Sequence, residues 1–442
     1  MTLGSRSRTT PRPRAASRAD RAGASTTART STTARTRTAA RTRGLGPAPA
    51  NASAEITTVI ALFALLTVGS YLPTPMYPIY QQIFGFDDLM MTLIYATTTV
   101  AAAPALLLFG PASDTLGRRL VILVSIALGA VGALCFLFAT GPGWLLAGRA
   151  AQGLSLAAAT AAGTVLVVER TPPDRLARAS LLVTAVWVGG PALGNLLSGF
   201  MAEFAPFPQH TPFVMMLVLL TVIWVRAARI DSPATVSLRS WRPVRPRVPH
   251  EIRAGFALAT ATVSVAWITL TLFLSVVPAL LLRLAGVESP AVSGGILAAM
   301  LVCSMLTQPF IVRFSAARLQ SVGTVALLIA LVGLALDGGR SVVPTVICAV
   351  IAGLGHGLAL GGGTASLDAL TTAENRAAVN AAFYLFSYLA TGAPAVAVGL
   401  LSTWIPLSSA LSAFAWLGTG LAAVTILAMI SRAVRDRGFI AA

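Results

Sequence analysis

Two side chains in the apolar part of this sequence have the chemistry to carry charge. Arg149 lies five residues into an apolar run that begins near Trp144, which places it roughly 7 Å deep if the run is a membrane-spanning helix. A guanidinium at that depth costs free energy unless it faces protein or a water-filled cavity, or extends to the headgroups. His356, in GLGHGLALGGG, could carry a proton or stay neutral with one hydrogen bond. Arg149 is therefore a candidate for a functional charge within the membrane, and His356 is a candidate proton carrier.

A cluster of charged residues lies between two apolar runs, in the stretch Gly110–Leu120 with the sequence GPASDTLGRRL. We predict a short polar loop, in which two glycines allow a tight turn and two arginines anchor the cytosolic face. Asp114 beside these arginines indicates a specific partner, either an arginine or a helix N-terminus, and the alternative is a solvated acid. The candidate residues of this loop are Gly110, Asp114, Gly117, Arg118 and Arg119.

Aromatic and polar side chains in the apolar runs are candidates for contact with a cargo. The first run contains SYLPTPMYPIYQQ, residues 70–82, whose prolines must interrupt backbone hydrogen bonding. Such a break is tolerated where a helix lines a cavity. Core or interfacial packing explains each candidate as well. The candidates are Tyr71, Tyr77, Gln81, Trp187, Trp267, Gln308, Tyr384 and Tyr388.

Small and helix-bending residues gather in WVGGPALGN, residues 187–195. Glycine and proline at this spacing favour a kink and close contact between helices. A packing motif and a functional motif both fit the stretch, and its last residue could face a cavity. The residues in question are Gly190, Pro191, Gly194 and Asn195.

The sequence lacks the residue clusters of an enzyme or a metal centre. It has three histidines and no H-E-x-x-H pattern. Its three cysteines lie inside apolar runs, as small buried hydrophobes do. No stretch is long and polar enough to form a nucleotide-binding domain. We therefore expect no enzymatic activity, no cofactor and no metal.

The elements that position these residues are apolar helices. The chain of 442 residues is 56% hydrophobic and 11% charged, with a mean hydropathy of +0.79, whereas soluble domains are about 25% charged. Apolar runs of 18 or more residues recur, and each is long enough to span a bilayer. We predict an all-α polytopic membrane protein with twelve transmembrane helices, at roughly 56–80, 89–109, 120–140, 144–168, 179–202, 212–229, 255–282, 291–312, 321–337, 343–366, 377–402 and 405–430.

The arginines support this count and set an orientation. With both termini in the cytosol, 18 arginines outside the N-terminal segment fall on the cytosolic side. Only Arg283 and Arg340 fall outside. A miscounted helix would have scrambled this asymmetry.

The segments outside the helices suggest the domain organisation. Residues 1–54 hold 11 arginines and one acid and cannot bury a core, so we expect a disordered cytosolic tail. A lipid tether, a nucleic-acid arm, a targeting peptide and an overlong reading frame are alternatives for it. The remaining segments are expected to be an N-terminal bundle at 55–229, a cytosolic linker at 230–254, a C-terminal bundle at 255–430 and a cytosolic tail at 431–442.

The two halves are faintly similar at an offset of about 200 residues. Gly163-Thr164 in the fourth predicted helix matches Gly363-Thr364 in the tenth. Gly190-Pro191 has a counterpart in Gly392-Ala393-Pro394. The second-half equivalent of the charged loop, RFSAARLQ at 313–320, has lost the acid.

Three of these motifs resemble those of the major facilitator superfamily of secondary transporters. The charged loop matches the pattern G-x-x-x-D-x-x-G-R-R between the second and third helices, with Ala112 where a bulky apolar residue is usual. GRAAQG at 148–153 resembles the motif R-x-x-Q-G of the fourth helix, whose arginine is associated with proton coupling. This resemblance implies that Arg149 and Gln152 are coupling candidates, in addition to His356. GPALGN at 190–195 resembles the antiporter motif G-P-x-x-G-G of exporters, with Asn195 in place of the last glycine.

The resemblance implies two six-helix bundles that alternate access to a central site. It also implies that the acid equivalent to Asp114 helps to lock one conformation. We expect a proton-coupled exporter of drugs or metabolites in the plasma membrane. Its expected partners are a small-molecule cargo and the lipid bilayer, and we expect no nucleic-acid partner. The chain is expected to be a monomer. A solute uptake symporter shares the fold, and a transport-inactive receptor is a rival of another class.

Overall fold

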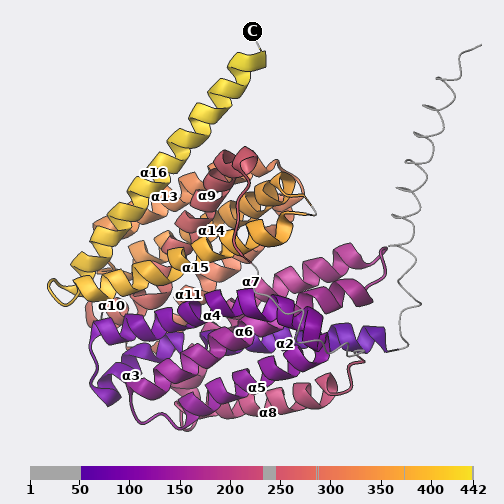
Figure 1. Ribbon diagram of the computed structural model, residues 1–442. Coiled ribbons are helices and arrows are strands. Elements are labelled where there is room, and N and C mark those ends of the chain that lie inside the picture. The colour runs from indigo at the N-terminus through magenta and orange to yellow at the C-terminus, as the bar shows by residue number, and fades with distance from the viewer. Residues whose placement is uncertain (1–50, 232–244, 285, 287, 373, 441–442) are drawn as a thin grey trace, which may run out of the picture. The chain divides into compact units, whose positions relative to one another are not determined.

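The computed structural model describes residues 51–231, 245–284, 286, 288–372 and 374–440. Every regular element in these residues is a helix (Figure 1). We call residues 51–231 the first half and residues 245–440 the second half. The predicted tail at 1–50 and the centre of the predicted linker, 232–244, lie outside the described residues.

The first half contains seven α-helices and one short 3₁₀ helix, which follow the predicted apolar runs. In chain order they are α2 (Ala52–Tyr71), η1 (Thr74–Met76), α3 (Tyr77–Phe84), α4 (Asp88–Leu116), α5 (Arg118–Leu137), α6 (Pro142–Arg170), α7 (Leu176–Phe204) and α8 (Thr211–Ala227). The interior of this half is apolar and aromatic. Phe136 of α5 and Phe213 of α8, for example, stack with their ring centroids 5.0 Å apart.

The second half repeats this arrangement with shorter breaks. Its elements are η3 (His250–Ile252), α9 (Arg253–Ser275), α10 (Val277–Leu284), α11 (Pro290–Leu306), α12 (Gln308–Ile311), α13 (Ala316–Asp337), α14 (Val342–Leu370), α15 (Arg376–Leu401) and α16 (Leu407–Ile440). Eleven helical segments in the described residues are long and apolar enough to span a membrane, and α8 is an apolar helix of 17 residues. With α8 included, these segments are the twelve predicted spans.

Three predicted helices are interrupted. The run predicted at 56–80 is split into α2 and α3 by η1, where the prolines cannot donate backbone hydrogen bonds. The run predicted at 255–282 breaks between α9 and α10, and the run at 291–312 breaks at Thr307. A proline follows closely after each of these two breaks, Pro278 after the first and Pro309 after the second.

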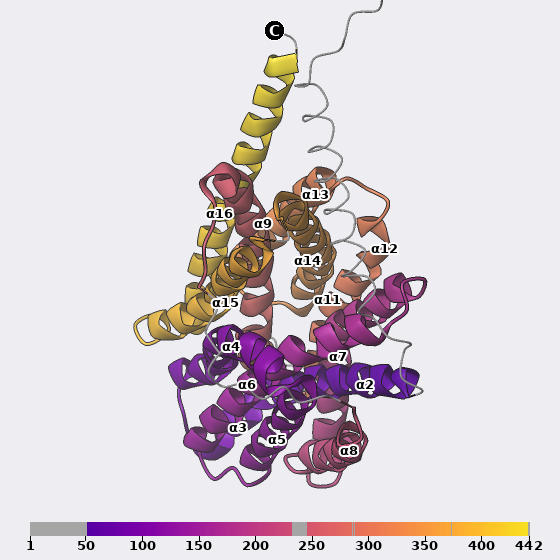
Figure 2. The ribbon, with the colours of Figure 1, turned by 45° about the vertical axis from the view of Figure 1, so that its right-hand side comes forward.

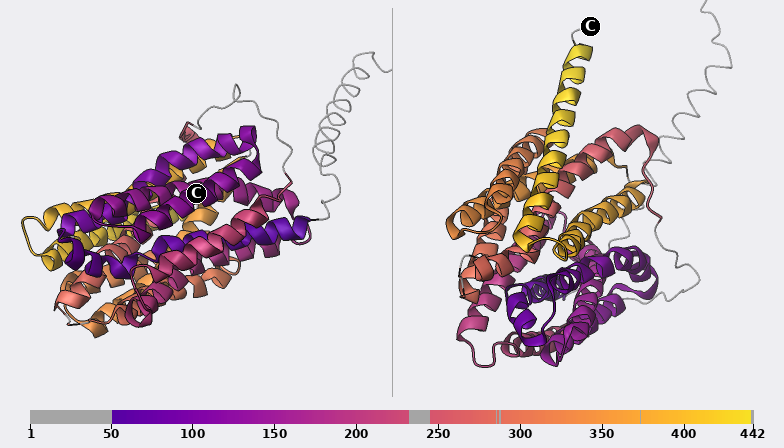
Figure 3. Two further views of the ribbon diagram at one scale, coloured as in Figure 1. Left: turned by 90° about the horizontal axis from the view of Figure 1, so that it is seen from below. Right: turned by 90° about the vertical axis from the view of Figure 1, so that its left-hand side faces the viewer.

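The predicted ends of several segments need correction. Residues 52–54 were expected in the disordered tail but form the first turn of α2. The C-terminal tail predicted from residue 431 continues α16 as far as Ile440, and Figure 3 shows this long helix in yellow. The polar loop predicted at 110–120 is also wrong, because α4 runs to Leu116 and α5 starts at Arg118. Only Gly117 separates them, with a φ of 89° that favours glycine.

Close helix crossings repeat between the halves at the offset found in the sequence. A Cβ atom on Gly153 of α6 would lie 2.1 Å from the Thr98 carbonyl oxygen of α4. A Cβ atom on Gly353 of α14 would lie 2.1 Å from the Met300 carbonyl oxygen of α11. Glycine therefore allows the same close approach in both halves.

The halves meet mainly along two helix pairs, α7 with α11 and α4 with α15 (Figure 2). A Cβ atom on Gly199 of α7 would lie 2.5 Å from the Pro290 carbonyl oxygen, and one on Gly399 of α15 would lie 1.8 Å from the Thr92 hydroxyl. These two glycines again match at the offset of about 200 residues. They bring the backbones of the two halves together near the start of α4 and α11.

The helix termini form two ends, which we name after an arginine at each. The Arg283 end contains the turns after α3, α5, α7, α10, α13 and α15, and the Arg118 end contains those after α4, α6, α8, α12 and α14. Apart from the buried Arg149, only Arg283 and Arg340 among the described arginines belong to the Arg283 end. The asymmetry seen in the sequence is therefore an asymmetry between two ends of one helical array.

Candidate functional site

Arg149 lies in the second turn of α6 and is 3% exposed. Its guanidinium donates from Nε to the Tyr77 hydroxyl at 2.6 Å and from Nη1 to Gln152 Oε1 at 3.1 Å. It also donates to the Ser70 carbonyl oxygen and, at 3.4 Å, to the Thr74 hydroxyl. The side chain thus points into the first half, and the alternative that it extends to the headgroups is wrong.

The break in the first helix creates this site. Prolines around η1 end α2 at Tyr71 and leave the Ser70 carbonyl free to accept from Arg149. The restart at α3 then places Tyr77 beside the guanidinium, with the Arg149 Cζ 5.2 Å from the ring centroid. The sequence predicted both the break and the tyrosine but not that they serve the same arginine.

The hydrogen-bond acceptors around Arg149 are neutral. In the part of the chain that the structure describes, no carboxylate forms an ion pair with it. A buried charge without a counter-ion is costly, and hydrogen bonds alone offset that cost only in part. A negative charge that arrived in this region would therefore act strongly on Arg149.

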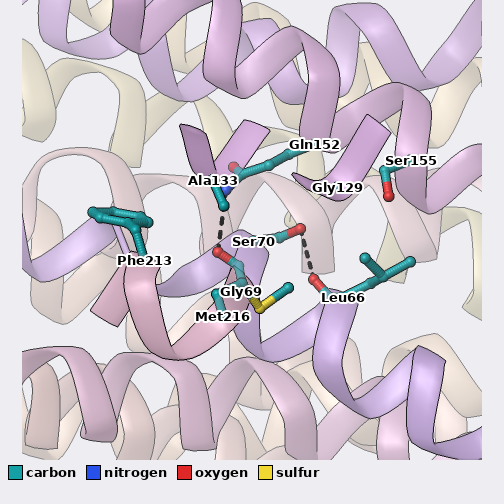
Figure 4. Close-up of a pocket in the computed structure, with 9 residues that line it drawn as sticks. All are labelled: Leu66, Gly69, Ser70, Gly129, Ala133, Gln152, Ser155, Phe213 and Met216. Atoms are coloured by element: carbon teal, nitrogen blue, oxygen red, sulfur yellow. Dashed lines mark hydrogen bonds between the residues drawn. The ribbon is translucent and has the colours of Figure 1, made fainter. Parts of the chain in front are cut away.

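A small cavity lies on the other side of Gln152 (Figure 4). Gln152 bridges it to Arg149, because its Nε2 donates to the Gly69 carbonyl oxygen at 3.2 Å while its Oε1 accepts from the guanidinium. The cavity has room for about one water molecule, so it is too small for a cargo. Its lining residues are Leu66, Gly69, Ser70, Gly129, Ala133, Gln152, Ser155, Phe213 and Met216.

Tyrosines extend the site from Arg149 towards the second half. Tyr71 is half-buried at the end of α2, near Tyr388 of α15. Tyr95 of α4, which the sequence analysis missed, is 9% exposed and faces Thr271 of α9. Tyr388 is in turn 6.5 Å from Tyr384, measured between ring centroids. Aromatic rings with hydroxyls therefore lie on both sides of the boundary between the halves.

His356 is buried in the middle of α14, apart from Arg149. Its Nδ1 is 2.9 Å from the Ser304 hydroxyl of α11, and its ring packs edge-on against Trp267 of α9 at 5.5 Å between centroids. Its Nε2 has no hydrogen-bond partner in the described residues. The structure thus places this histidine and the predicted Trp267 together, in the second half.

The remaining cargo candidates are dispersed. Gln81 lies at the Arg283 end and bonds to Asp88 at 3.0 Å. Trp187 packs on Phe63 with 5.9 Å between centroids, which fits core packing. Gln308 is half-buried in the short helix α12.

The predicted charged loop forms an ion-pair cluster on helical residues. Arg118 at the start of α5 bonds to Asp114 in the last turn of α4 at 2.6 Å, and to Glu169 of α6 at 3.2 Å. The expected arginine partner of Asp114 is thus Arg118, while Glu169 was missed because it lies far away in the sequence. Arg119 is exposed, and a Cβ atom on Gly110 would meet no atom within 4 Å.

The glycines of the stretch 187–195, which lies in α7, serve close packing. A Cβ atom on Gly190 would lie 2.0 Å from the Thr67 hydroxyl, and one on Gly194 would lie 2.4 Å from the Val68 carbonyl oxygen. Both glycines therefore seat α7 on α2, and Pro191 lies between them inside the helix. Asn195 is fully buried and donates to the Pro191 carbonyl oxygen at 2.9 Å, while its Oδ1 has no partner in the described residues.

The described residues contain no group of three or more histidine, cysteine or acidic side chains that could hold a metal ion. The geometry of the site is instead that of a buried cation, hydroxyls and aromatic rings near the junction of two helical halves. Comparison with known proteins identifies the family of the chain. The model of the Major Facilitator Superfamily matches residues 59–394.

The chain belongs to the major facilitator superfamily. Among curated proteins, it is 29% identical over 223 residues to a cephamycin export protein, CmcT, of Amycolatopsis lactamdurans, a match that covers 50% of this chain and 45% of that protein. It is 31% identical over 146 residues to an inner membrane transport protein, YnfM, of Escherichia coli, covering 33% of this chain and 34% of that protein. The chain thus spans less than half the length of these curated relatives.

Solved structures show the same fold. A crystal structure of a peptide transporter, POT, in complex with sulfate has a TM-score of 0.66 with 13% sequence identity. The match covers 86% of this chain and 94% of that one. At this identity the likeness establishes the superfamily fold alone, so the predicted all-α fold of apolar helices is confirmed.

Proposed function

We propose that this member of the superfamily is a secondary active transporter that exports a small molecule by alternating access, with a proton gradient as its source of energy. The proposal places it in the cell membrane with both termini in the cytosol. The bilayer and a small-molecule cargo are its partners, and one chain is the working unit because the chain itself supplies both halves. No nucleic acid takes part in this proposal.

The observation that carries the proposal is the buried Arg149 with neutral acceptors only. A charge held in this way is sensitive to any charge that enters the same region, which is what coupling between a proton and a cargo requires. Tyr71 in the first half and Tyr388 in the second lie near each other and offer aromatic surfaces and hydroxyls to a cargo.

Export is favoured over uptake by two observations. The relative from Amycolatopsis lactamdurans is named as an export protein. The part of α7 that contains Gly190, Pro191 and Gly194 resembles the antiporter motif of exporters. A symporter would share the fold, and the direction of flux against that of the proton separates the two. Neither named relative offers support for a transport-inactive receptor.

The first experiment identifies a cargo. Purified protein is screened by thermal unfolding against small molecules, beginning with a cephamycin, because a bound ligand raises the unfolding temperature by mass action. Each hit is then loaded into proteoliposomes to measure flux under an imposed pH gradient. Movement of the cargo opposite to the proton supports the proposal, movement with the proton overturns export, and binding without flux overturns transport.

A second experiment tests coupling. Arg149→Ala and His356→Gln are compared in the same vesicles, with and without the pH gradient. If Arg149 couples the two movements, its removal abolishes the dependence of cargo flux on the gradient. Full dependence in both variants would remove both residues from the coupling mechanism.

A further inference from the structure

Only one ion pair in the described residues joins the two halves. Arg283, at the end of α10 in the second half, donates from Nη2 to Asp88 Oδ1 at 2.6 Å and from Nη1 to Asp88 Oδ2 at 2.8 Å. Asp88 lies in the first turn of α4, in the first half. The pair is bidentate, which fixes its geometry and makes it stronger than a single charged hydrogen bond.

Gln81 completes this contact. Its Nε2 donates to Asp88 Oδ1 at 3.0 Å, and its Oε1 accepts from Arg283 Nη2 at 3.2 Å. Gln81 lies in the last turn of α3, which ends at Phe84. The three side chains therefore form a closed ring of hydrogen bonds across the boundary between the halves.

A second polar contact joins the halves at the same end. Glu203, in the last turn of α7, accepts a hydrogen bond from the Ser289 hydroxyl and another from the Ala291 backbone N–H at 3.1 Å. Ser289 is the N-cap of α11, in the second half. A carboxylate at a helix N-terminus is stabilised by the free N–H groups and the helix dipole.

The Arg118 end is different. Its ion pairs are Arg118 with Asp114 and Glu169, Arg170 with Glu55, and Arg175 with Asp174, and all of them lie within the first half. Across the described residues, no ion pair at that end bridges to the second half. Within this part of the chain, charged contacts between the halves are therefore confined to the Arg283 end.

We propose that these two contacts form a polar latch that holds the halves together at the Arg283 end and must open for that end to admit or release a cargo. The inference rests on the alternating access of the proposed function. The latch is suited to reversible opening, because the side chains of Arg283 and Asp88 are 43% and 18% exposed and regain water readily when they part. A fully buried pair would be far harder to separate. The latch residues are Gln81, Asp88, Glu203, Arg283 and Ser289.

The latch is tested by distances between the halves, which need no cargo. In a variant without Cys135, Cys303 and Cys348, spin labels are placed at Phe207 and Trp404, two exposed positions in different halves at the Arg283 end. A second pair of labels at Asp174 and Glu374 reports on the Arg118 end. Distance distributions are measured by pulsed electron resonance in lipid nanodiscs.

We expect Arg283→Gln and Asp88→Asn to raise the population with a long distance between Phe207 and Trp404 by roughly two- to tenfold, as loss of a partly exposed bidentate pair implies. The distance between Asp174 and Glu374 should shorten in the same molecules. The double variant Arg283→Asp with Asp88→Arg should restore the short distance between Phe207 and Trp404, because it exchanges the two charges.

Arg340→Gln is the matched control. It removes another arginine from the same end, and Arg340 forms no ion pair within the described chain. Unchanged distances in Arg283→Gln, or equal changes in Arg340→Gln, would overturn the latch. The parent protein separates failure of the latch from failure of alternating access. If it shows both a short and a long distance at each label pair, alternating access stands even when the latch is overturned. If it shows one narrow distance distribution at each pair, alternating access is overturned as well.

Discussion

The two halves of the chain share their helix crossings but differ in where they hold charge. Gly153 and Gly353 occupy matching crossings about 200 residues apart, and each lies against a backbone carbonyl of the neighbouring helix. At the same spacing, the buried Arg149 corresponds to the buried Ala349. Close packing needs only a missing Cβ atom and is easily repeated, whereas a buried cation is costly. The second half repeats the framework without the charge.

The Arg118 end gives a second instance of the same contrast. In the first half, Arg118 pairs with the carboxylate of Asp114, four residues before it, at 2.6 Å. In the second half, the Arg318 Cζ lies 5.3 Å from the ring centroid of Phe314, also four residues before it. The arginine is retained, but its partner has changed from an acid to an aromatic ring. A cation–π contact fixes the side chain more weakly than an ion pair that Glu169 reinforces.

The largest effect is expected at Arg149, the buried charge of the first half that has no counterpart at the matching position of the second half. Arg149→Met keeps the apolar volume and removes the guanidinium, so cargo flux should fall roughly a hundredfold, which corresponds to the loss of a coupling free energy of about 3 kcal/mol. The unfolding temperature should change little, because the lost hydrogen bonds and the relieved charge burial offset each other. Flux in proteoliposomes and thermal unfolding are measured side by side, with Arg340→Met, at an exposed arginine, as control. Flux within twofold of the parent would contradict a functional charge at this position.

The next effect is expected to be equal in the two halves. Gly153→Ala and Gly353→Ala each place a Cβ atom 2.1 Å from a carbonyl oxygen, so the helices must move apart. We expect each to destabilise the protein by about 1–3 kcal/mol, the usual range for overpacking. Thermal unfolding in detergent checks this, with Gly420→Ala as control because a Cβ atom there meets nothing within 4 Å. A large loss in one half alone would break the equivalence of the crossings.

A smaller effect is expected from the ion pair at the Arg118 end. Asp114→Asn leaves Arg118 with Glu169 and Ser113 as partners and should lower flux severalfold without affecting membrane insertion. Insertion is checked by the yield of folded protein in membranes, and flux is checked in proteoliposomes. Normal flux in this variant would show that Asp114 is only a solvated acid at the end of α4.

The smallest effect is expected at the matching position of the second half. Phe314→Leu removes the ring beneath Arg318 and should cost about 0.5–1 kcal/mol of stability, with flux unchanged. The comparison with Asp114→Asn in one flux assay is the decisive measurement. An equal loss of flux in both variants would mean that the two halves use this end in the same way.

Much of the fold was predictable from hydrophobicity and arginine placement. The apolar runs predicted twelve helices, and the described residues contain eleven long apolar segments together with α8. Helix ends were predicted less well, because polar residues can continue a helix beyond an apolar run, as they do from Gly110 to Leu116. The prolines predicted a break in the first helix, and η1 is that break.

The candidate site was predictable only in part. Arg149, Gln152 and Tyr77 were singled out by type and position, and they are in contact. The role of the Ser70 carbonyl could not be predicted, since any backbone carbonyl is the same in a sequence. The contacts of Glu169, Tyr95 and Arg283 were missed, because they join helices that are distant along the chain.

The sequence by itself determined that this chain is an array of apolar helices with its arginines gathered at one end, because the cost of placing charge in hydrocarbon acts on each residue separately. Only the tertiary structure decided which polar groups meet. Hydrogen bonds and ion pairs require atoms within about 3 Å of each other. Which helices come that close depends on the crossings that glycines such as Gly199 and Gly399 allow.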